Sequence, residues 1–258
     1  MATYTTEIAS DKLVSDNPIH QRLLKAYIAA KPWISGKLLE VGCGEGRGVD
    51  ILLPLAEDYL GIDKIGEVID SLQKKHLKTK FEQAVIPPFS TIEDSSFNTV
   101  VSFQVIEHIQ DDKLFLEEIY RVLKPGGIAI ISTPNINFTL SRNPWHIREY
   151  KPEQLTKLCN EVFDQVESRG IGGNKKVWAY HEANRVSVQK IMQYDIFNLQ
   201  YRLPASLLKI PYEILNRRNR NKLHKQQGQS VTDITQEDYL LIDDASKALD
   251  LFYILHKK

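Results

Sequence analysis

The chain has 258 residues, enough for one α/β domain with a sizeable core and an elaboration, but tight for two independent domains. Lys and Arg number 33, as do Asp and Glu, so the neutral total gives no general attraction for nucleic acid. Only Cys43 and Cys159 are present, which excludes a disulfide framework. The start lacks a signal-peptide pattern, and no apolar run approaches the ~18 residues of a membrane span. These features predict a cytoplasmic protein.

The first predicted element is an amphipathic helix from Asn17 to about Lys31. Pro18 suits the first helical position. Four apolar side chains share one face of this helix: Leu23, Leu24, Tyr27 and Ile28. We therefore expect residues 1–35 to form an N-terminal segment whose helix can cover a bound cofactor.

A buried strand over 37–42 leads directly into a glycine-rich turn. Gly42, Gly44 and Gly46 are spaced G-x-G-x-G, whereas the nicotinamide-cofactor fingerprint G-x-G-x-x-G would require a glycine in place of Arg47. Glycines between a strand and a helix allow the backbone to approach a ligand closely. The segment therefore predicts a site for a nucleoside cofactor other than NAD.

A second feature lies at the distance that such a site requires. Residues 59–63 have the pattern of the next parallel strand, and Asp63 stands at its carboxyl end. A carboxylate about 20 residues beyond the glycine turn can accept both hydroxyls of a ribose. The turn and the acid together indicate nucleoside binding more strongly than either does alone.

Strands and helices alternate through the rest of the core. Strands are expected near 37–42, 58–63, 78–84, 97–103, 126–133 and 163–170, and helices near 46–56, 66–77, 111–123 and 151–163. This alternation predicts an α/β fold with a doubly wound parallel sheet.

The chain resembles the class I S-adenosylmethionine (SAM) dependent methyltransferases. The resemblance is carried by Glu40–Gly46, Asp63, Ser96–Ser102, Val105–His108 and Leu123–Gly127, covers about 35–172 and returns at the carboxyl end. It implies a Rossmann-like seven-stranded sheet, mostly parallel, with an antiparallel last strand over 248–255. It also implies SAM as cofactor, S-adenosylhomocysteine as its product, and contacts from Glu40, Gly42, Cys43, Gly44, Gly46, Asp63, Gln83 and Gln104. Gln83 stands where the family usually has an acidic or polar residue beside the adenine.

A long insertion distinguishes the chain from a minimal member of that family. It is predicted over 174–246, between the methyltransferase core at 36–173 and the last core strand within 247–258. Helices are expected over 185–201 and 205–215, with an interruption at Pro211. Because insertions in this fold lie where substrate enters, we expect this one to act as a lid or a substrate-recognition unit.

The insertion is electrically polarised. From Asn174 to Ser230 there are 11 Lys or Arg against three acids, a net charge of +8, and five acids with no base follow from Val231 to Ser246. Residues 203–225 combine apolar and basic side chains, as a helix in contact with a membrane surface does. Arg217, Arg218 and Arg220 could grip phosphates, although such a run is more commonly a solvated helix end.

Two histidines are the candidate catalytic residues. His108 follows the fourth strand and His146 follows the fifth, so both lie at the carboxyl edge of the sheet, where open α/β folds bind ligands. Either can serve as a general base for a hydroxyl acceptor. The candidate acceptor-binding residues are Glu107, Trp145, Tyr180 and Tyr194.

The spacing of Gln104, Glu107 and His108 is similar to a metal site in two methyltransferase branches. Ubiquinone-pathway O-methyltransferases and small-RNA 2′-O-methyltransferases carry a glutamate at the position of Gln104, and the RNA branch has a second histidine that aligns with His146. Replacing a carboxylate by a neutral amide weakens a site for a hard cation. The sequence therefore predicts that no metal is bound.

The predicted function is SAM-dependent methylation of a hydroxyl on a small molecule or a saccharide, with cell-surface glycans as one such class. An RNA methyltransferase and a non-catalytic SAM-binding module remain alternatives. Nucleic acid is not the expected partner, and the oligomeric state is left open.

Overall fold

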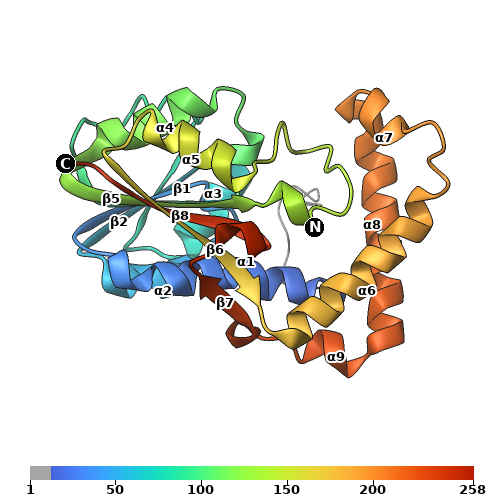
Figure 1. Ribbon diagram of the computed structural model, residues 1–258. Coiled ribbons are helices and arrows are strands. Elements are labelled where there is room, and N and C mark those ends of the chain that lie inside the picture. The colour runs from blue at the N-terminus through green and yellow to red at the C-terminus, as the bar shows by residue number, and fades with distance from the viewer. Residues whose placement is uncertain (1–12) are drawn as a thin grey trace.

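A twisted eight-stranded sheet runs through the computed structural model, which describes residues 13–258 (Figure 1). The strands are β1 (Lys37–Val41), β2 (Asp58–Asp63), β3 (Lys80–Gln83), β4 (Phe97–Phe103), β5 (Leu123–Pro134), β6 (Gln165–Gly173), β7 (Tyr239–Ile242) and β8 (Asp250–His256). They are ordered β3-β2-β1-β4-β5-β8-β6-β7. The five strands from β3 to β5 are parallel, β8 is antiparallel to both β5 and β6, and β7 is antiparallel to β6.

This topology confirms the Rossmann-like sheet with an antiparallel last strand, but the expected count of seven strands is wrong. The eighth strand, β7, lies inside the segment that the sequence assigned to a helical insertion. It pairs with Gly170–Gly173, the end of β6, which continues beyond the expected boundary at 170. The glycine-rich run Gly170–Gly173 carries little strand signal, and the partner Tyr239–Ile242 is too short to show alternation.

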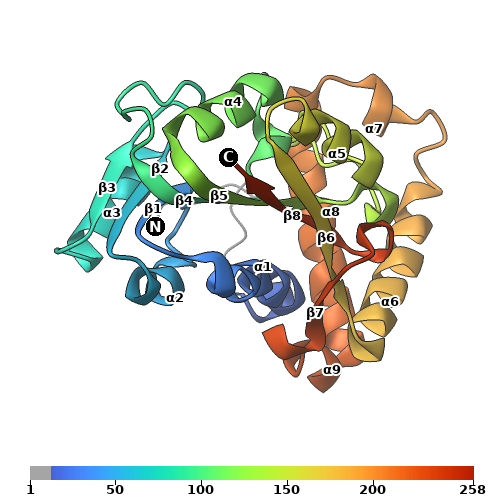
Figure 2. The ribbon, with the colours of Figure 1, turned by 60° about the vertical axis from the view of Figure 1, so that its left-hand side comes forward.

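Helices cover both faces of the sheet (Figures 1 and 2). One face packs against α1 (Asn17–Ala30), α2 (Val49–Leu52) and α3 (Gly66–Lys75), and the other against α4 (Asp112–Val122) and α5 (Pro152–Asn160). The helix expected over 46–56 is only the short α2, because a 3₁₀ turn with Pro54 near its start follows at Leu53–Leu55. The carboxyl ends of the strands therefore share one edge, between the two helical layers.

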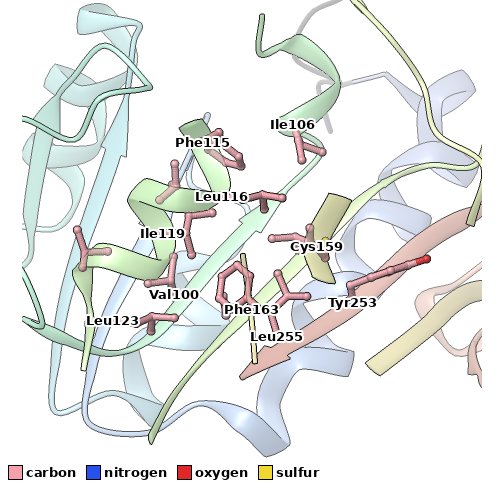
Figure 3. Close-up of a cluster of buried hydrophobic side chains, with 14 of the residues drawn as sticks. Val100, Ile106, Phe115, Leu116, Ile119, Leu123, Cys159, Phe163, Tyr253 and Leu255 are labelled. Atoms are coloured by element: carbon pink, nitrogen blue, oxygen red, sulfur yellow. The ribbon is translucent and has the colours of Figure 1, made fainter. Parts of the chain in front are cut away.

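The apolar face of α4 packs against the sheet on the face that α4 and α5 cover (Figure 3). Phe115 and Ile119, one helical turn apart, are fully buried together with Val100 of β4 and Leu255 of β8. Burying a side chain of this size contributes roughly 1.5–3 kcal/mol. This packing fixes β4, and with it the loop at its carboxyl end that carries Gln104.

The insertion stands at one end of the sheet, beyond β6 and β7 (Figure 2). It consists of α6 (Lys175–Met192), α7 (Leu199–Arg202), α8 (Ala205–Gln227) and α9 (Gln229–Thr232), with α6 and α8 side by side. The first helix was predicted to begin at residue 185, but α6 begins at Lys175. Its start is fixed by the Asn174 side chain, which accepts hydrogen bonds from the Lys176 and Val177 amides at 2.9 and 3.2 Å.

Helix α8 does not break at Pro211, contrary to the expectation. A proline inside a helix removes the hydrogen bond that its amide would have donated. Pro211 lies on the exposed side of α8, where water can satisfy the carbonyl left without that donor. Within residues 13–258, neither α8 nor any other helix combines the length and hydropathy that a membrane crossing requires.

Asp16 ties α8 to the start of α1. Its buried carboxylate accepts hydrogen bonds from Arg217 at 2.9 and 3.0 Å and from Arg220 at 3.1 Å. Two of the three arginines considered as a phosphate grip are thus paired with one buried carboxylate. Arg218 alone is exposed, because it lies on the opposite side of the helix.

Candidate cofactor and acceptor sites

A cavity of about 340 Å³ opens at the carboxyl ends of β1, β2 and β4. The strand order reverses between β1 and β4, and open α/β sheets bind ligands at such a switch point. Five of the predicted cofactor residues line it: Gly42, Cys43, Gly44, Asp63 and Gln104.

The glycine turn has the shape of a ligand cradle. Gly42 and Gly44 have φ angles of +79° and +52°, a region that favours glycine. A Cβ atom on Gly42 would lie 2.4 Å from Val105 Cγ2, so this position is sterically closed. A Cβ on Gly44 would meet no atom within 4 Å, so the backbone there is open to the cavity. A ligand can therefore contact the turn at Gly44.

The Asp63 carboxylate is held in the wall of the cavity by backbone amides. Gly44 N donates to Oδ2 at 2.9 Å, and Ile65 N donates to Oδ1 at 3.0 Å. These bonds fix the side chain, and each carboxylate oxygen retains a second lone pair for a ligand hydroxyl. Asp63 thus couples the glycine turn to the position where a ribose would bind.

Glu40, Gly46 and Gln83 lie outside the cavity lining, contrary to the predicted direct contacts. The Glu40 carboxylate lies behind the glycine turn, where it accepts hydrogen bonds from the hydroxyls of Tyr27, at 2.9 Å, and Tyr59. Burial raises the pKa of Glu40 to about 7, although the two hydroxyls oppose the shift. Gln83 Nε2 donates to Lys64 O at 3.0 Å. Both side chains therefore support the wall from outside.

The sequence interpretation missed most of the cavity's apolar and charged wall. The missed residues are Glu45, Arg47, Lys64, Ile65, Val85, Ile86, Phe103, Val105, His108 as a cofactor neighbour, and Ile109, whereas Leu23 and Tyr27 belong to the helix that was expected to cover the cofactor. Ile65 and Val105 each come shortly after a predicted strand, and this position could have identified them as cavity residues. Arg47 was used only to exclude the NAD fingerprint, although it brings a cation to the cavity.

A second cavity, of about 250 Å³, adjoins the first between the core and the insertion. Leu23, Gln104 and His108 line both cavities. Gln104 has a φ angle of +59°, an uncommon conformation for a residue other than glycine, and such outliers cluster at functional sites. The junction of the two cavities is therefore where a bound cofactor and a bound acceptor would meet.

The two predicted catalytic histidines come together at this junction. Their rings meet edge to face with centroids 4.9 Å apart. His108 Nδ1 lies 2.9 Å from the Trp145 carbonyl oxygen, which can only accept, so in the neutral ring Nδ1 carries the proton and Nε2 is the basic nitrogen. His146 Nδ1 lies 2.6 Å from Glu149 Oε1, and its Nε2 lies 2.8 Å from Asn143 Nδ2.

Glu107 is buried beside the histidines. Oε2 accepts a hydrogen bond from Thr133 Oγ1 at 2.9 Å, and Oε1 has no hydrogen-bond partner among residues 13–258. Burial raises the pKa of Glu107 to about 7, and the proximity of His146 opposes that rise. Ligand atoms of Glu107, His108 and His146 lie within 4.8 Å of one another, so this donor set can in principle hold a cation.

Two of the four predicted acceptor residues line the second cavity, Glu107 and Tyr180. Tyr194 does not: it follows the end of α6 and is 88% exposed, so the structure does not bring it to this cavity. Trp145 also lies outside the lining, and its ring packs under the Lys209 ammonium at 3.5 Å.

The charges around the second cavity are largely compensated. Arg22 pairs with the buried Asp250 at 3.1 Å, and Arg220 pairs with Asp16. Burial, reinforced by Arg22, lowers the pKa of His181 to about 4, so its ring is neutral at neutral pH. Other members of the lining supply amides and hydroxyls: Asn143, Asn184, Asn216, Asn219, Thr139 and Tyr212. The cavity is therefore suited to an uncharged polar ligand.

Comparison with known proteins agrees with this geometry. A family model described as "Methyltransferase domain" matches residues 39–131. A probable SAM-dependent methyltransferase of Mycolicibacterium smegmatis is 37% identical over 139 residues, which cover 50% of this chain and 52% of that protein. Human mitochondrial ubiquinone biosynthesis O-methyltransferase is 33% identical over 132 residues, 48% of this chain and 34% of that protein. The chain thus spans about half the length of the first relative and about a third of the second.

The fold is shared over nearly the whole chain with a SAM-dependent methyltransferase of Thermotoga maritima described as a possible histamine N-methyltransferase. That structure has a TM-score of 0.59 at 13% identity and covers 93% of this chain and 92% of its own. Fold, cavity and matched residues together define a nucleoside-cofactor domain of the methyltransferase type. Residues 39–131 match a methyltransferase domain, and the fold around them is the one seen in SAM-dependent methyltransferases.

Proposed function

We propose that the protein transfers the methyl group of SAM to a hydroxyl of a small polar molecule. The observation that carries this proposal is the junction of the two cavities, whose shared lining includes Gln104 and His108. SAM bound along the glycine turn would rest its ribose on Asp63 and its carboxylate near Arg47. An acceptor in the second cavity would then face the methyl group in line with the breaking bond.

In the proposed reaction the acceptor oxygen attacks the methyl carbon as the carbon–sulfur bond breaks. Bound SAM would supply the methyl group from its sulfonium and would leave as the neutral thioether S-adenosylhomocysteine, and His108 Nε2 would accept the hydroxyl proton. His146, held by Glu149 and Asn143, packs its ring against the His108 ring and so keeps that base in position. A positioned general base contributes about 10²–10⁴-fold to the rate.

The lining of the second cavity favours an uncharged, hydroxyl-bearing acceptor such as a saccharide. Tyr180 and Tyr212 offer rings against which a sugar face can pack, and the amides offer both donors and acceptors. RNA is disfavoured because Arg217 and Arg220, which could have met phosphates, are paired with Asp16.

We further propose that the reaction needs no metal. Gln104 supplies an amide where a carboxylate would strengthen a cation site, and both ring nitrogens of His146 already have partners in Asn143 and Glu149. A cation would have to displace Asn143 to reach Nε2. Because Glu107, His108 and His146 could together bind a cation, the activity must also be measured after chelation.

Radiolabelled SAM tests the function directly. The enzyme should transfer tritiated methyl to components of a saccharide and phenol panel, and the product should be an ether. Transfer to an amine or to RNA, with none to hydroxyl compounds, would contradict the proposed acceptor class. Binding of SAM with no transfer to any acceptor would instead support a non-catalytic module.

A further inference from the structure

Helix α8 turns an apolar stripe toward solvent. Leu207, Ile210 and Ile214, spaced for one face of a helix, are 62%, 70% and 47% exposed. The opposite face carries polar residues, including Asn216 and Asn219, that line the second cavity. The first half of α8 thus exposes apolar side chains where a surface helix in water usually carries polar ones.

The apolar surface continues into the neighbouring turn and α7. Tyr194, Ile196, Phe197 and Tyr201 are 88%, 75%, 62% and 66% exposed. Figure 1 places α7 beside the first turns of α8, and Figure 2 shows it on the side of the molecule opposite β1–β3. We call the exposed large side chains of this region the apolar tip: Tyr194, Ile196, Phe197, Leu199, Tyr201, Leu207, Ile210, Ile214 and Leu215. A cluster of this size marks an interaction surface rather than scattered exposure.

Basic side chains continue the same stripe. Arg218, Lys222 and Lys225 are exposed on the C-terminal half of α8, at helical spacing from Ile214. Over residues 186–226 the chain has eight Lys or Arg against two acids, Asp195 and Glu213. Arg217 and Arg220 share the single negative charge of Asp16, so the charge on this side remains positive.

We propose that the apolar tip and the basic half of α8 dock on the surface of an anionic lipid bilayer. Apolar and aromatic side chains beside lysines and arginines are the composition of helices that lie in a membrane interface. Charge complementarity selects this occupant, because anionic headgroups attract the basic half. A second copy of the chain is a less suitable partner, because its own basic side chains would repel those of α8. The inference is independent of the proposed methyl transfer.

Vesicle sedimentation tests the docking surface. The full chain should co-sediment with phosphatidylcholine vesicles that contain phosphatidylglycerol, much less with phosphatidylcholine alone, and less as salt is raised. Leu207→Ser/Ile210→Ser should weaken binding at least tenfold. Arg218→Glu/Lys222→Glu/Lys225→Glu should weaken it by roughly fivefold or more per charge removed.

Matched controls separate the surface from general effects. Leu77→Ser removes an apolar side chain that is 83% exposed on the opposite end of the molecule, and Lys74→Glu/Lys78→Glu/Lys157→Glu reverses three exposed charges elsewhere. Both should bind vesicles like the unchanged chain, with SAM affinity confirming that every variant is folded. No sedimentation with anionic vesicles, or equal loss in the controls, would overturn the proposal. A dimer that Leu207→Ser/Ile210→Ser converts to a monomer without lipid would assign the tip to self-association instead.

Discussion

Arg220 Nη1 lies 3.1 Å from Asp16 Oδ1, and this ion pair joins the insertion helix α8 to the first turn of α1. Arg217 binds the same carboxylate. The pairing links segments about 200 positions apart in the chain. Arg22, Tyr180 and Arg220 line the second cavity, so the ion pair lies at the wall of the proposed acceptor site.

Removing this link should loosen α8 without damaging the cofactor site. Asp16→Ala leaves two guanidinium groups without their shared anion, and we expect a loss of about 2 kcal/mol in the free energy of unfolding. Hydrogen exchange should speed up across α8, and acceptor turnover should fall while SAM affinity holds. Arg218→Ala is the control: Arg218 follows Arg217 in the chain but is exposed, so its removal should change the free energy of unfolding by less than ~0.5 kcal/mol. Equal exchange rates in α8 of both variants would show that the ion pair does not dock the helix.

Asp63→Ala should weaken SAM binding by one to two decades. The substitution removes charge-assisted hydrogen bonds to the ribose, each worth roughly 1.5–3 kcal/mol. Isothermal titration calorimetry measures the change, and Asp70→Ala, an exposed acid on α3, serves as control. Undiminished affinity in a folded Asp63→Ala protein would refute the assignment of the ribose site.

Activity should survive extensive chelation. Gln104 replaces a carboxylate, and His146 is already engaged by Asn143 and Glu149. Elemental analysis of the purified protein, with turnover measured before and after treatment with a chelator, checks this. If magnesium or manganese restores an activity that chelation abolished, Glu107, His108 and His146 form a metal site and the metal-free reaction is wrong.

Glu40 should make the protein less stable as pH rises. Its pKa is about 7 in the folded state, mainly because it is buried, against 4.5 for the ordinary group. The folded state therefore holds a proton that the unfolded state releases, and the resulting stabilisation is complete below about pH 4.5 and lost as pH passes 7. The full effect is on the order of 3 kcal/mol. Urea unfolding at several pH values measures it.

Glu40→Gln should flatten that pH dependence, because an amide is uncharged at every pH and does not titrate. Glu107, whose pKa is also raised to about 7, remains in the variant and should leave a residual slope of the same sign. A pH dependence unchanged by Glu40→Gln would mean that Glu40 is not the titrating group.

The core was predictable because its signals are local. The turn at Gly42–Gly46, the acid at Asp63 and the two histidines after their strands each follow from a few adjacent residues. Once the sheet is parallel, the carboxyl ends of its strands share one edge, so His108 and His146 were correctly expected on the same side. The sequence also indicated an apolar and basic surface in the insertion.

The insertion was harder because its contacts are distant in sequence. Nothing in the sequence near Arg217 and Arg220 shows that they pair with Asp16. The exposed apolar stripe of α8 inverts the usual pattern, so periodicity could not tell which side faces the core. Tyr194 was expected to line a pocket because it is aromatic, but it lies beyond the end of α6, on the apolar tip.

The most direct measurement of the central claim is His108→Gln assayed for SAM affinity and for transfer of labelled methyl in the same preparation. His108 lies at the junction of both cavities, and the proposal makes it the base rather than a cofactor anchor. We predict SAM affinity within about twofold of the unchanged protein and transfer reduced by about 10²-fold or more, the contribution of a positioned base. Transfer at the original rate, or a parallel loss of SAM binding that accounts for the whole decrease, would contradict the account.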